Sequence, residues 1–372
     1  MFSQKIKTIE NILNKFGTVI DIDKSKCVQL RSKRASCKDC ISACPSSAIN
    51  ISNNEVDIDS EKCSECGICC KVCKTGVFKF KNLSETGFYD DLSGQSEKQG
   101  HVVLSCSKCK AAKEENTLTV PCLGWVDASV ILWSVASGAK EIYLQYNDCK
   151  TCNVGCGFDA ITSEIAGIQK LLGSYVEENN IKFTILNRTP LPACDTVQTP
   201  SEDEVLTRRG LFGYFHKRTK ASIFHAVNFI SETQQTHNSA RADIIKKTIE
   251  IPVKKQMLTH SIGKLFPLLS KAESIAEYKN IGILSIDVSK CNLCGVCYKL
   301  CPTRALKEIS EENAEGYLKK VGICFNSKGC VKCNLCVELC TAGAVSYRTN
   351  VTLSEYIDSQ NDESAVLIKS KD

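Results

Sequence analysis

The sequence is poor in the features that mark several common classes of protein. No apolar run approaches the roughly 20 residues that span a bilayer, and the longest candidate, around 128–139, is short enough to be a buried helix. The net charge of +5 over 372 residues is too small to predict nucleic-acid binding. No P-loop and no flavin or NAD fingerprint stands between a strand and a helix. We therefore expect neither a membrane-spanning protein nor a nucleic-acid binder, and we find no catalytic constellation.

Histidine is also scarce, which bears on the choice of metal. The five histidines are scattered, and we assign none of them as a ligand: His101, His216, His225, His237 and His260. The first residues, MFSQKIKTIENILNKF, predict an amphipathic helix without the apolar core of a secretion signal. We expect a cytoplasmic protein with reduced thiols, with association to a membrane through a partner as the alternative.

Cysteine, by contrast, is abundant, with 25 among 372 residues. A disulfide scaffold is typical of small secreted domains, and structural zinc prefers paired Cys-x-x-Cys motifs, often with histidine. Three closely spaced cysteines followed by a fourth are instead typical of cubane iron–sulfur clusters. The spacing therefore favours [4Fe–4S] clusters.

The cysteines near both ends of the chain form four such runs, in two modules. In two-cluster bacterial ferredoxins, the fourth cysteine of each run binds the cluster of the other run. Four sites follow from this rule: Cys27, Cys37, Cys40 and Cys73 (site 1); Cys63, Cys66, Cys69 and Cys44 (site 2); Cys291, Cys294, Cys297 and Cys340 (site 3); Cys330, Cys333, Cys336 and Cys301 (site 4). Three runs have the spacing C-x2-C-x2-C-x3-C, whereas the first cysteine of the remaining run is displaced upstream to Cys27. Cys70 would be a spectator.

The residues between Cys27 and Cys37, VQLRSKRAS, carry three positive charges, on Arg31, Lys33 and Arg34. Positive charge beside site 1 would favour its more negative, reduced state and raise its potential. The alternative is a solvated docking surface. Within the modules, AINIS-NNE-VDIDS and ALKEIS-EENAEG-YLKKVGI predict β-hairpins.

Residues 101–187 follow a different pattern, in which short apolar runs alternate with helical spacing. HVVLSC, LTVPC, EIYLQYNDC and IKFTIL predict four strands, while ASVILWSVASGA and residues 160–176 predict helices. This alternation predicts a parallel sheet, whose strands share one carboxyl edge. Six cysteines follow three of these strands, so we expect their thiols to converge at that edge: Cys106, Cys109, Cys122, Cys149, Cys152 and Cys156.

The motifs VVLSCSKC and PCLGWVD, the latter followed by a helix and a Gly-Ala-Lys-Glu turn, resemble the delta-subunit family of methyl-viologen-reducing hydrogenases over roughly 100–187. That family links hydrogenase to heterodisulfide reductase and carries an iron–sulfur cluster, usually [2Fe–2S]. The late group, YNDCKTCNVGC, departs from the family's usual glycine- and histidine-bearing form. The resemblance implies a fifth cluster, [2Fe–2S] or [4Fe–4S], for which we expect Cys106, Cys122, Cys149 and Cys152 as ligands (site 5), with Cys109 and Cys156 as alternates. A zinc site or a disulfide is the other reading.

The fold predicted for the whole chain is α+β, with two ferredoxin-like 2[4Fe–4S] modules around a central small parallel α/β domain, plus a helical segment. We place an N-terminal module with a leading helix at 1–83, a linker at 84–100, the middle domain at 101–187, a second linker at 188–207, the helical segment at 208–280, the C-terminal module at 281–350 and a tail at 351–372. Cys194 and Cys324 lie outside every pattern, and buried free thiols are expected there.

Basic and aromatic side chains alternate at helical spacing in residues 208–230. They predict a helix packed on a partner or on the modules; peripheral contact with a membrane surface is the alternative.

Several clusters on one chain without a substrate pocket predict an electron-transfer subunit that is not itself catalytic. It would relay single electrons between partner oxidoreductases in a larger redox complex of anaerobic metabolism. Hydrogenase, formate dehydrogenase or heterodisulfide-reductase-like subunits that contain flavin are the expected partners. The alternatives are an iron–sulfur redox sensor, an assembly or maturation factor for a partner enzyme, and a reductase whose fifth site performs chemistry.

Overall fold

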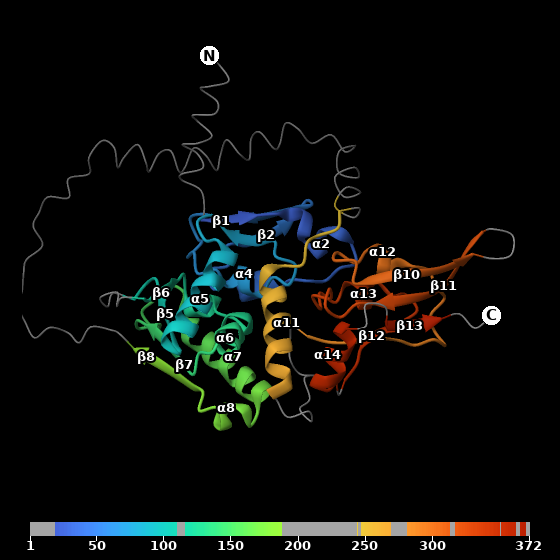
Figure 1. The fold of residues 1–372 in the computed structure, drawn as a ribbon. Coiled ribbons are helices and arrows are strands. Elements are labelled where there is room, and N and C mark those ends of the chain that lie inside the picture. The colour runs from blue at the N-terminus through green and yellow to red at the C-terminus, as the bar shows by residue number, and fades with distance from the viewer. Residues whose placement is uncertain are drawn as a thin grey trace, which may run out of the picture.

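Three cysteine-bearing units surround one long helix, α11 (Val253–Leu265), in the computed structural model (Figure 1). The structure describes residues 19–109, 116–187, 244, 247–268, 281–312, 317–349, 351–361 and 365–369. The predicted leading helix, the linker at 188–207 with Cys194, and the segment 208–230 lie outside these residues. No helix within the described ranges has the length and apolar character needed to cross a membrane.

The middle domain contains a four-stranded parallel sheet, as the alternating pattern predicts. Its strands lie in the order β6-β5-β7-β8: β5 (His101–Cys106), β6 (Leu118–Val120), β7 (Glu141–Tyr146) and β8 (Lys182–Asn187). The connections contain η2 (Leu123–Trp125), α6 (Ala128–Ala136), α7 (Gly157–Leu172) and α8 (Tyr175–Glu178). Helix α6 is apolar on nearly every face because α5, α7 and α11 all pack against it.

The prediction of a linker at 84–100 is wrong, because this segment forms helix α5 (Glu85–Gln99) of the middle domain. The Ser84 hydroxyl caps the helix by accepting a bond of 3.1 Å from the Gly87 N–H. Phe88, Tyr89 and Leu92 are buried, and the Tyr89 hydroxyl lies 2.6 Å from the Ser129 hydroxyl on α6. The acids Asp90, Asp91 and Glu97 are exposed, whereas Ser96 is buried with the apolar side chains.

The two terminal modules share the order strand, helix, hairpin, helix, strand, to which the N-terminal module adds η1 and α2. The N-terminal module contains β1 (Ile20–Ile22), η1 (Lys24–Lys26), α2 (Val28–Arg31), α3 (Asp39–Ala43), β2 (Ile49–Ser52), β3 (Glu55–Ile58), α4 (Ile68–Val72) and β4 (Phe78–Phe80). The C-terminal module contains β9 (Leu284–Ile286), α12 (Val296–Lys299), β10 (Leu306–Glu312), β11 (Leu318–Phe325), α13 (Leu335–Leu339) and β12 (Val345–Tyr347). In both, the first and last strands pair antiparallel and a hairpin lies between them. Both predicted hairpins are therefore confirmed.

Within the segment predicted as a tail, 351–372, residues 351–361 and 365–369 are part of the fold. Helix α14 (Leu353–Asn361) buries Leu353 and Tyr356, and β13 (Ala365–Lys369) pairs antiparallel with β11. The Tyr356 hydroxyl accepts a bond of 2.8 Å from Lys255 Nζ of α11. The short helix η3 (Phe266–Leu268) continues α11 and contacts α14. The tail therefore attaches the C-terminal module to the central helix.

Candidate metal centres

Each cysteine run begins with a turn closed by an Asp or Asn side chain four residues before the first cysteine. The pairs are Asp23 with Cys27, Asp59 with Cys63, Asp287 with Cys291 and Asn326 with Cys330. Each side-chain oxygen accepts a backbone N–H two or three residues later: Ser25 at 3.1 Å, Glu61 at 3.0 Å, Ser289 at 3.0 Å and Gly329 at 3.2 Å. Sequence reasoning missed this spacing, which identifies Cys27 as the first cysteine of its run although the following loop is stretched.

The last cysteine of three runs is held by a second local bond. The backbone N–H four residues later donates to the sulfur, over 3.3 Å at Cys44, 3.3 Å at Cys73 and 3.2 Å at Cys340. Hydrogen bonds to a ligand sulfur stabilise its negative charge and tune the potential of a cluster. The short helices α3, α4 and α13 end at these cysteines, so the same turn repeats along the chain.

In the three regular runs, the residues directly before and after the second cysteine have a left-handed backbone conformation. The preceding residues are Glu65, Leu293 and Lys332, with φ of 55°, 53° and 51°, and the following residues are Gly67, Gly295 and Asn334, with φ of 74°, 82° and 67°. Non-glycine residues rarely adopt this conformation, and such strain clusters at ligand-holding loops. The displaced run lacks it after Cys37, because Lys38 has a φ of −132° and α3 begins at once.

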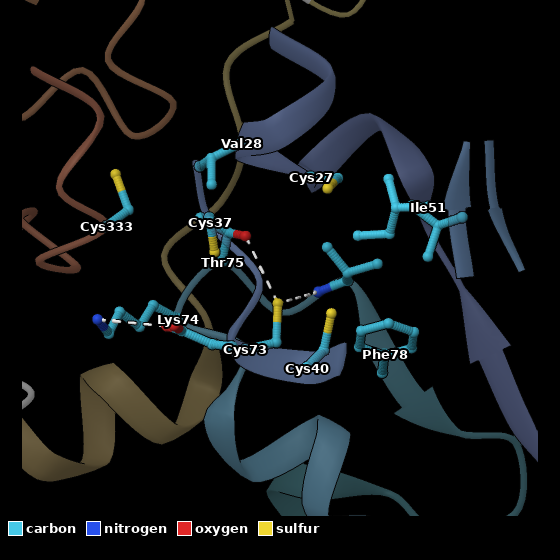
Figure 2. Close-up of a pocket in the computed structure, with 13 residues that line it drawn as sticks. Cys27, Val28, Cys37, Cys40, Ile51, Cys73, Lys74, Thr75, Phe78 and Cys333 are labelled. Atoms are coloured by element: carbon cyan, nitrogen blue, oxygen red, sulfur yellow. Dashed lines mark hydrogen bonds and ion pairs between the residues drawn. The ribbon is translucent and has the colours of Figure 1, made fainter. Parts of the chain in front are cut away.

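All four cysteines predicted for site 1 line a single cavity of about 450 Å³. Figure 2 shows the sulfurs of Cys27, Cys37, Cys40 and Cys73 around this space. Burial and the neighbouring thiolates raise the pKa of Cys40 to about 12. At such a pKa the thiol stays protonated, so only binding to a cation would hold these sulfurs as thiolates. The donor set therefore fits an iron–sulfur core.

The spacing of the thiols also bears on the kind of metal. In the parts of the chain that the structure describes, no three His, Cys, Asp or Glu side chains lie close enough to hold a single metal ion. The cysteine spacing in the sequence is therefore the observation that favours cubane clusters over zinc.

Site 5 lies at the carboxyl edge of the parallel sheet, where Cys106 ends β5, Cys122 follows β6 and the late cysteines follow β7. Cys106, Cys122, Cys149 and Cys152 line a cavity of about 820 Å³, whose lining includes neither Cys109 nor Cys156. Cys122 donates to Cys106, which lowers the pKa of Cys106 and raises that of Cys122.

Gly157 adjoins these sulfurs. A Cβ there would lie 2.7 Å from Cys122 Sγ and 3.8 Å from Cys149 Sγ. Only glycine leaves room at this position without a shift of the Cys122 side chain.

Two apolar contacts join neighbouring units at their cysteines. Cys66 of site 2 packs with Cys122 of site 5, together with Ile68 and Val154. Cys37 of site 1 and Cys333 of site 4 pack on a second group, formed by Val28, Leu335 and Leu339. Cys333 also lines the cavity of site 1. Cysteines predicted for sites of different units thus border the same apolar groups.

Four described residues lie outside these cavities: Cys70, Cys324, His101 and His260. Cys70 is buried beside Cys69, and its carbonyl oxygen accepts a bond of 2.6 Å from Lys254 Nζ. The expectation of a buried thiol at Cys324 is wrong, because it is half-buried on β11.

His101 packs edge-on against Tyr143, and His260 packs against Trp133.

Arg31 departs from the expectation for its loop. The segment forms helix α2, which turns the buried Arg31 side chain toward Cys301 and Cys333 of site 4. Lys33 and Arg34 are exposed. Only two of the three charges are therefore solvated, and the third lies at the contact between the modules.

One family model matches part of the chain. The 4Fe–4S binding domain matches residues 284–307, which contain β9 and the run from Cys291 to Cys301. No curated protein matches the chain. The protein therefore contains a 4Fe–4S binding domain, and at least one [4Fe–4S] cluster belongs to it.

Proposed function

We propose that the protein is a multi-cluster relay that passes single electrons between partner oxidoreductases. The observation that carries the proposal is the order in which the five cysteine sites touch. Site 5 adjoins site 2 through Cys122 and Cys66. Sites 2 and 1 share the core of the N-terminal module, which includes Cys69 and Cys40. The path then continues into the C-terminal module.

Site 1 adjoins site 4 through Cys37 and Cys333. Within the C-terminal module, Cys336 of site 4 lies in electrostatic range of Cys297 of site 3. We propose the order 5-2-1-4-3 for transfer along these contacts, although Cys106 of site 5 also borders one common core with cysteines of sites 3 and 4. A line of neighbouring redox sites suits the transfer of electrons between two distant partners.

The two ends of this line have different surroundings. Cys294 of site 3 is exposed. The lining of the site 5 cavity includes the polar residues Lys108, Asn147 and Asp148. Each cluster, when bound, takes up and releases one electron while its ligands stay in place. The apolar contacts between the sites exclude water from the path, and the loops keep the thiols in position.

The parallel sheet and the placement of site 5 support the resemblance of the middle domain to the hydrogenase delta-subunit family. We propose that site 5 is the port for one partner, a hydrogenase, formate dehydrogenase or heterodisulfide-reductase-like subunit with flavin. Site 3 would serve the second partner. The chain itself performs no substrate chemistry in this proposal.

Anaerobic reconstitution followed by iron analysis and electron paramagnetic resonance (EPR) tests the relay. We expect four cubanes and a fifth cluster, with magnetic interaction between reduced neighbours. Cys122→Ser should remove the interaction between sites 5 and 2, whereas Cys324→Ser, outside every site, should change nothing. Fewer than about 12 irons per chain, or signals from isolated clusters alone, would rule out the proposal.

A further inference from the structure

One aromatic side chain joins the two largest apolar cores of the described chain. The first core belongs to the N-terminal module, and the second extends from the middle domain into the C-terminal module. Among the residues that the structure describes, Trp125 alone packs against both. It is half-buried and ends η2, three residues after Cys122 of site 5. Its ring therefore lies at the boundary between two cluster-bearing units.

The Trp125 ring is held from two sides. On the side of the middle domain, the Phe88 ring of α5 meets it edge-on, with 5.2 Å between the ring centres. On the other side lies Gly67, which follows Cys66 of site 2, and a Cβ added to Gly67 would lie 2.8 Å from Trp125 Cδ1. Gly67 has a φ of 74°, a conformation that glycine adopts readily. The indole thus packs directly on the backbone of the loop that carries the cysteines of site 2.

The turn that carries Trp125 also holds a predicted ligand of site 5. The Trp125 N–H donates a bond of 2.9 Å to the carbonyl oxygen of Cys122, and the Gly124 N–H donates over 3.3 Å to Cys122 Sγ. Gly124 faces α4, because a Cβ added to it would lie 3.1 Å from Ile68 Cδ1. A movement of Trp125 would therefore change the position of Cys122 relative to the loop of site 2.

We propose that Trp125 is the positioning residue that fixes the separation of sites 5 and 2. This inference rests on the proposed relay, in which one electron leaves one of these sites and enters the other. An indole is large and stiff, and close packing around it leaves no room for water between the two units. Because tunnelling weakens steeply with distance, loss of the ring should uncouple the two sites. Neither site should lose its cluster, since Trp125 supplies no ligand.

EPR of the reduced, reconstituted full-length protein tests this role. The interaction between sites 5 and 2 is identified as the one that Cys122→Ser removes. Trp125→Ala should lose the same interaction while it keeps the native iron content and the interaction between sites 2 and 1. Trp125→Phe, which retains an aromatic ring, should keep most of the interaction between sites 5 and 2. Trp125→Leu takes the place of Trp125→Ala if that variant does not fold, and it should weaken the same interaction.

Trp133 provides a matched control, because it is the other tryptophan of the sequence and its ring packs against Tyr89 and His260. Trp133→Ala removes the same side chain from the same domain and should leave every interaction unchanged. The role of Trp125 is ruled out if Trp125→Ala keeps the full interaction between sites 5 and 2, or if Trp133→Ala loses it equally. Failure of the relay itself would show already in the native chain, as missing iron or as missing magnetic interaction.

Discussion

Cys37 and Cys333 pack on the same apolar group although they belong to opposite ends of the chain. Hydrogen bonds tie the same surfaces together, because the N–H and hydroxyl of Ser36 donate to the Glu338 carboxylate over 2.9 and 2.8 Å. Each module could hold its own clusters without this contact. In the proposed relay, the contact would join two separate pairs of sites into one path.

The contact between the modules can be weakened without touching a cysteine. Leu335 is 2% exposed, and Leu335→Ala should lower the free energy of unfolding by about 2–5 kcal/mol, as buried leucine truncations do. The magnetic interaction between sites 1 and 4 should weaken, whereas that between sites 1 and 2 should persist. Val288→Ala, at an exposed position, is the control. Unchanged coupling between sites 1 and 4 would contradict the proposed path.

The assignment of Cys27 can be tested against a neighbouring thiol. Cys27→Ser should remove about four irons per chain, the content of one cubane, because it deprives site 1 of its first ligand. Cys70→Ser should leave the iron content unchanged, although Cys70 is equally buried at 7%. Anaerobic reconstitution and iron analysis provide the measurement. Equal loss in both variants would mean that Cys27 is not a specific ligand.

The close approach of Gly157 to the sulfurs predicts a selective loss at site 5. Gly157→Ala should exclude the cluster there, because the added methyl group would clash with Cys122 Sγ. The other four sites should retain their iron. Gly94→Ala in α5 is a matched control, since no other atom lies within 4 Å of its new Cβ. A full complement of iron in Gly157→Ala would show that site 5 needs no such space.

Asp127 predicts a dependence of stability on pH. Its side chain caps α6 by accepting a hydrogen bond of 2.9 Å from the Ser129 N–H. Burial raises the pKa of Asp127, although the positive charge of Lys254 lowers it in part. A carboxyl with a raised folded-state pKa stabilises the fold at low pH. That contribution is lost as the pH rises from about 4, the unfolded value, through the folded pKa.

Asp127→Asn keeps the acceptor and removes the charge, so its stability relative to the native chain should increase with pH over that window and then level off. Asp127→Ala should instead lose about 1 kcal/mol through the missing cap. Denaturant unfolding at several pH values, followed by tryptophan fluorescence, measures both. If the native chain instead became more stable relative to Asp127→Asn as the pH rises, the pKa of Asp127 would not be raised in the folded state.

The features that sequence predicted well depend on short stretches of chain. The strands of the middle domain follow from local alternation, and the gathering of Cys106, Cys122 and Cys149 follows from the shared edge of parallel strands. The direction of Arg31 could not be predicted, because it depends on packing against α13, some 300 positions away. Helix α5 was missed because its polar face dominates the composition, and β13 because its partner strand is distant.

The central helix has a consequence for the rate of transfer. Two adjacent lysines of α11 form hydrogen bonds to opposite modules. Lys254 Nζ donates to the carbonyl oxygens of Cys70 and Lys71 in the N-terminal module. Lys255 Nζ donates to the Tyr356 hydroxyl, on the side of the C-terminal module. Successive side chains on a helix point about 100° apart, so one turn can hold two bodies at a fixed separation. Electron tunnelling weakens steeply with distance. In the proposed relay, a segment that contributes no cysteine would thus help to fix the distance between the modules, and with it the rate of transfer between them.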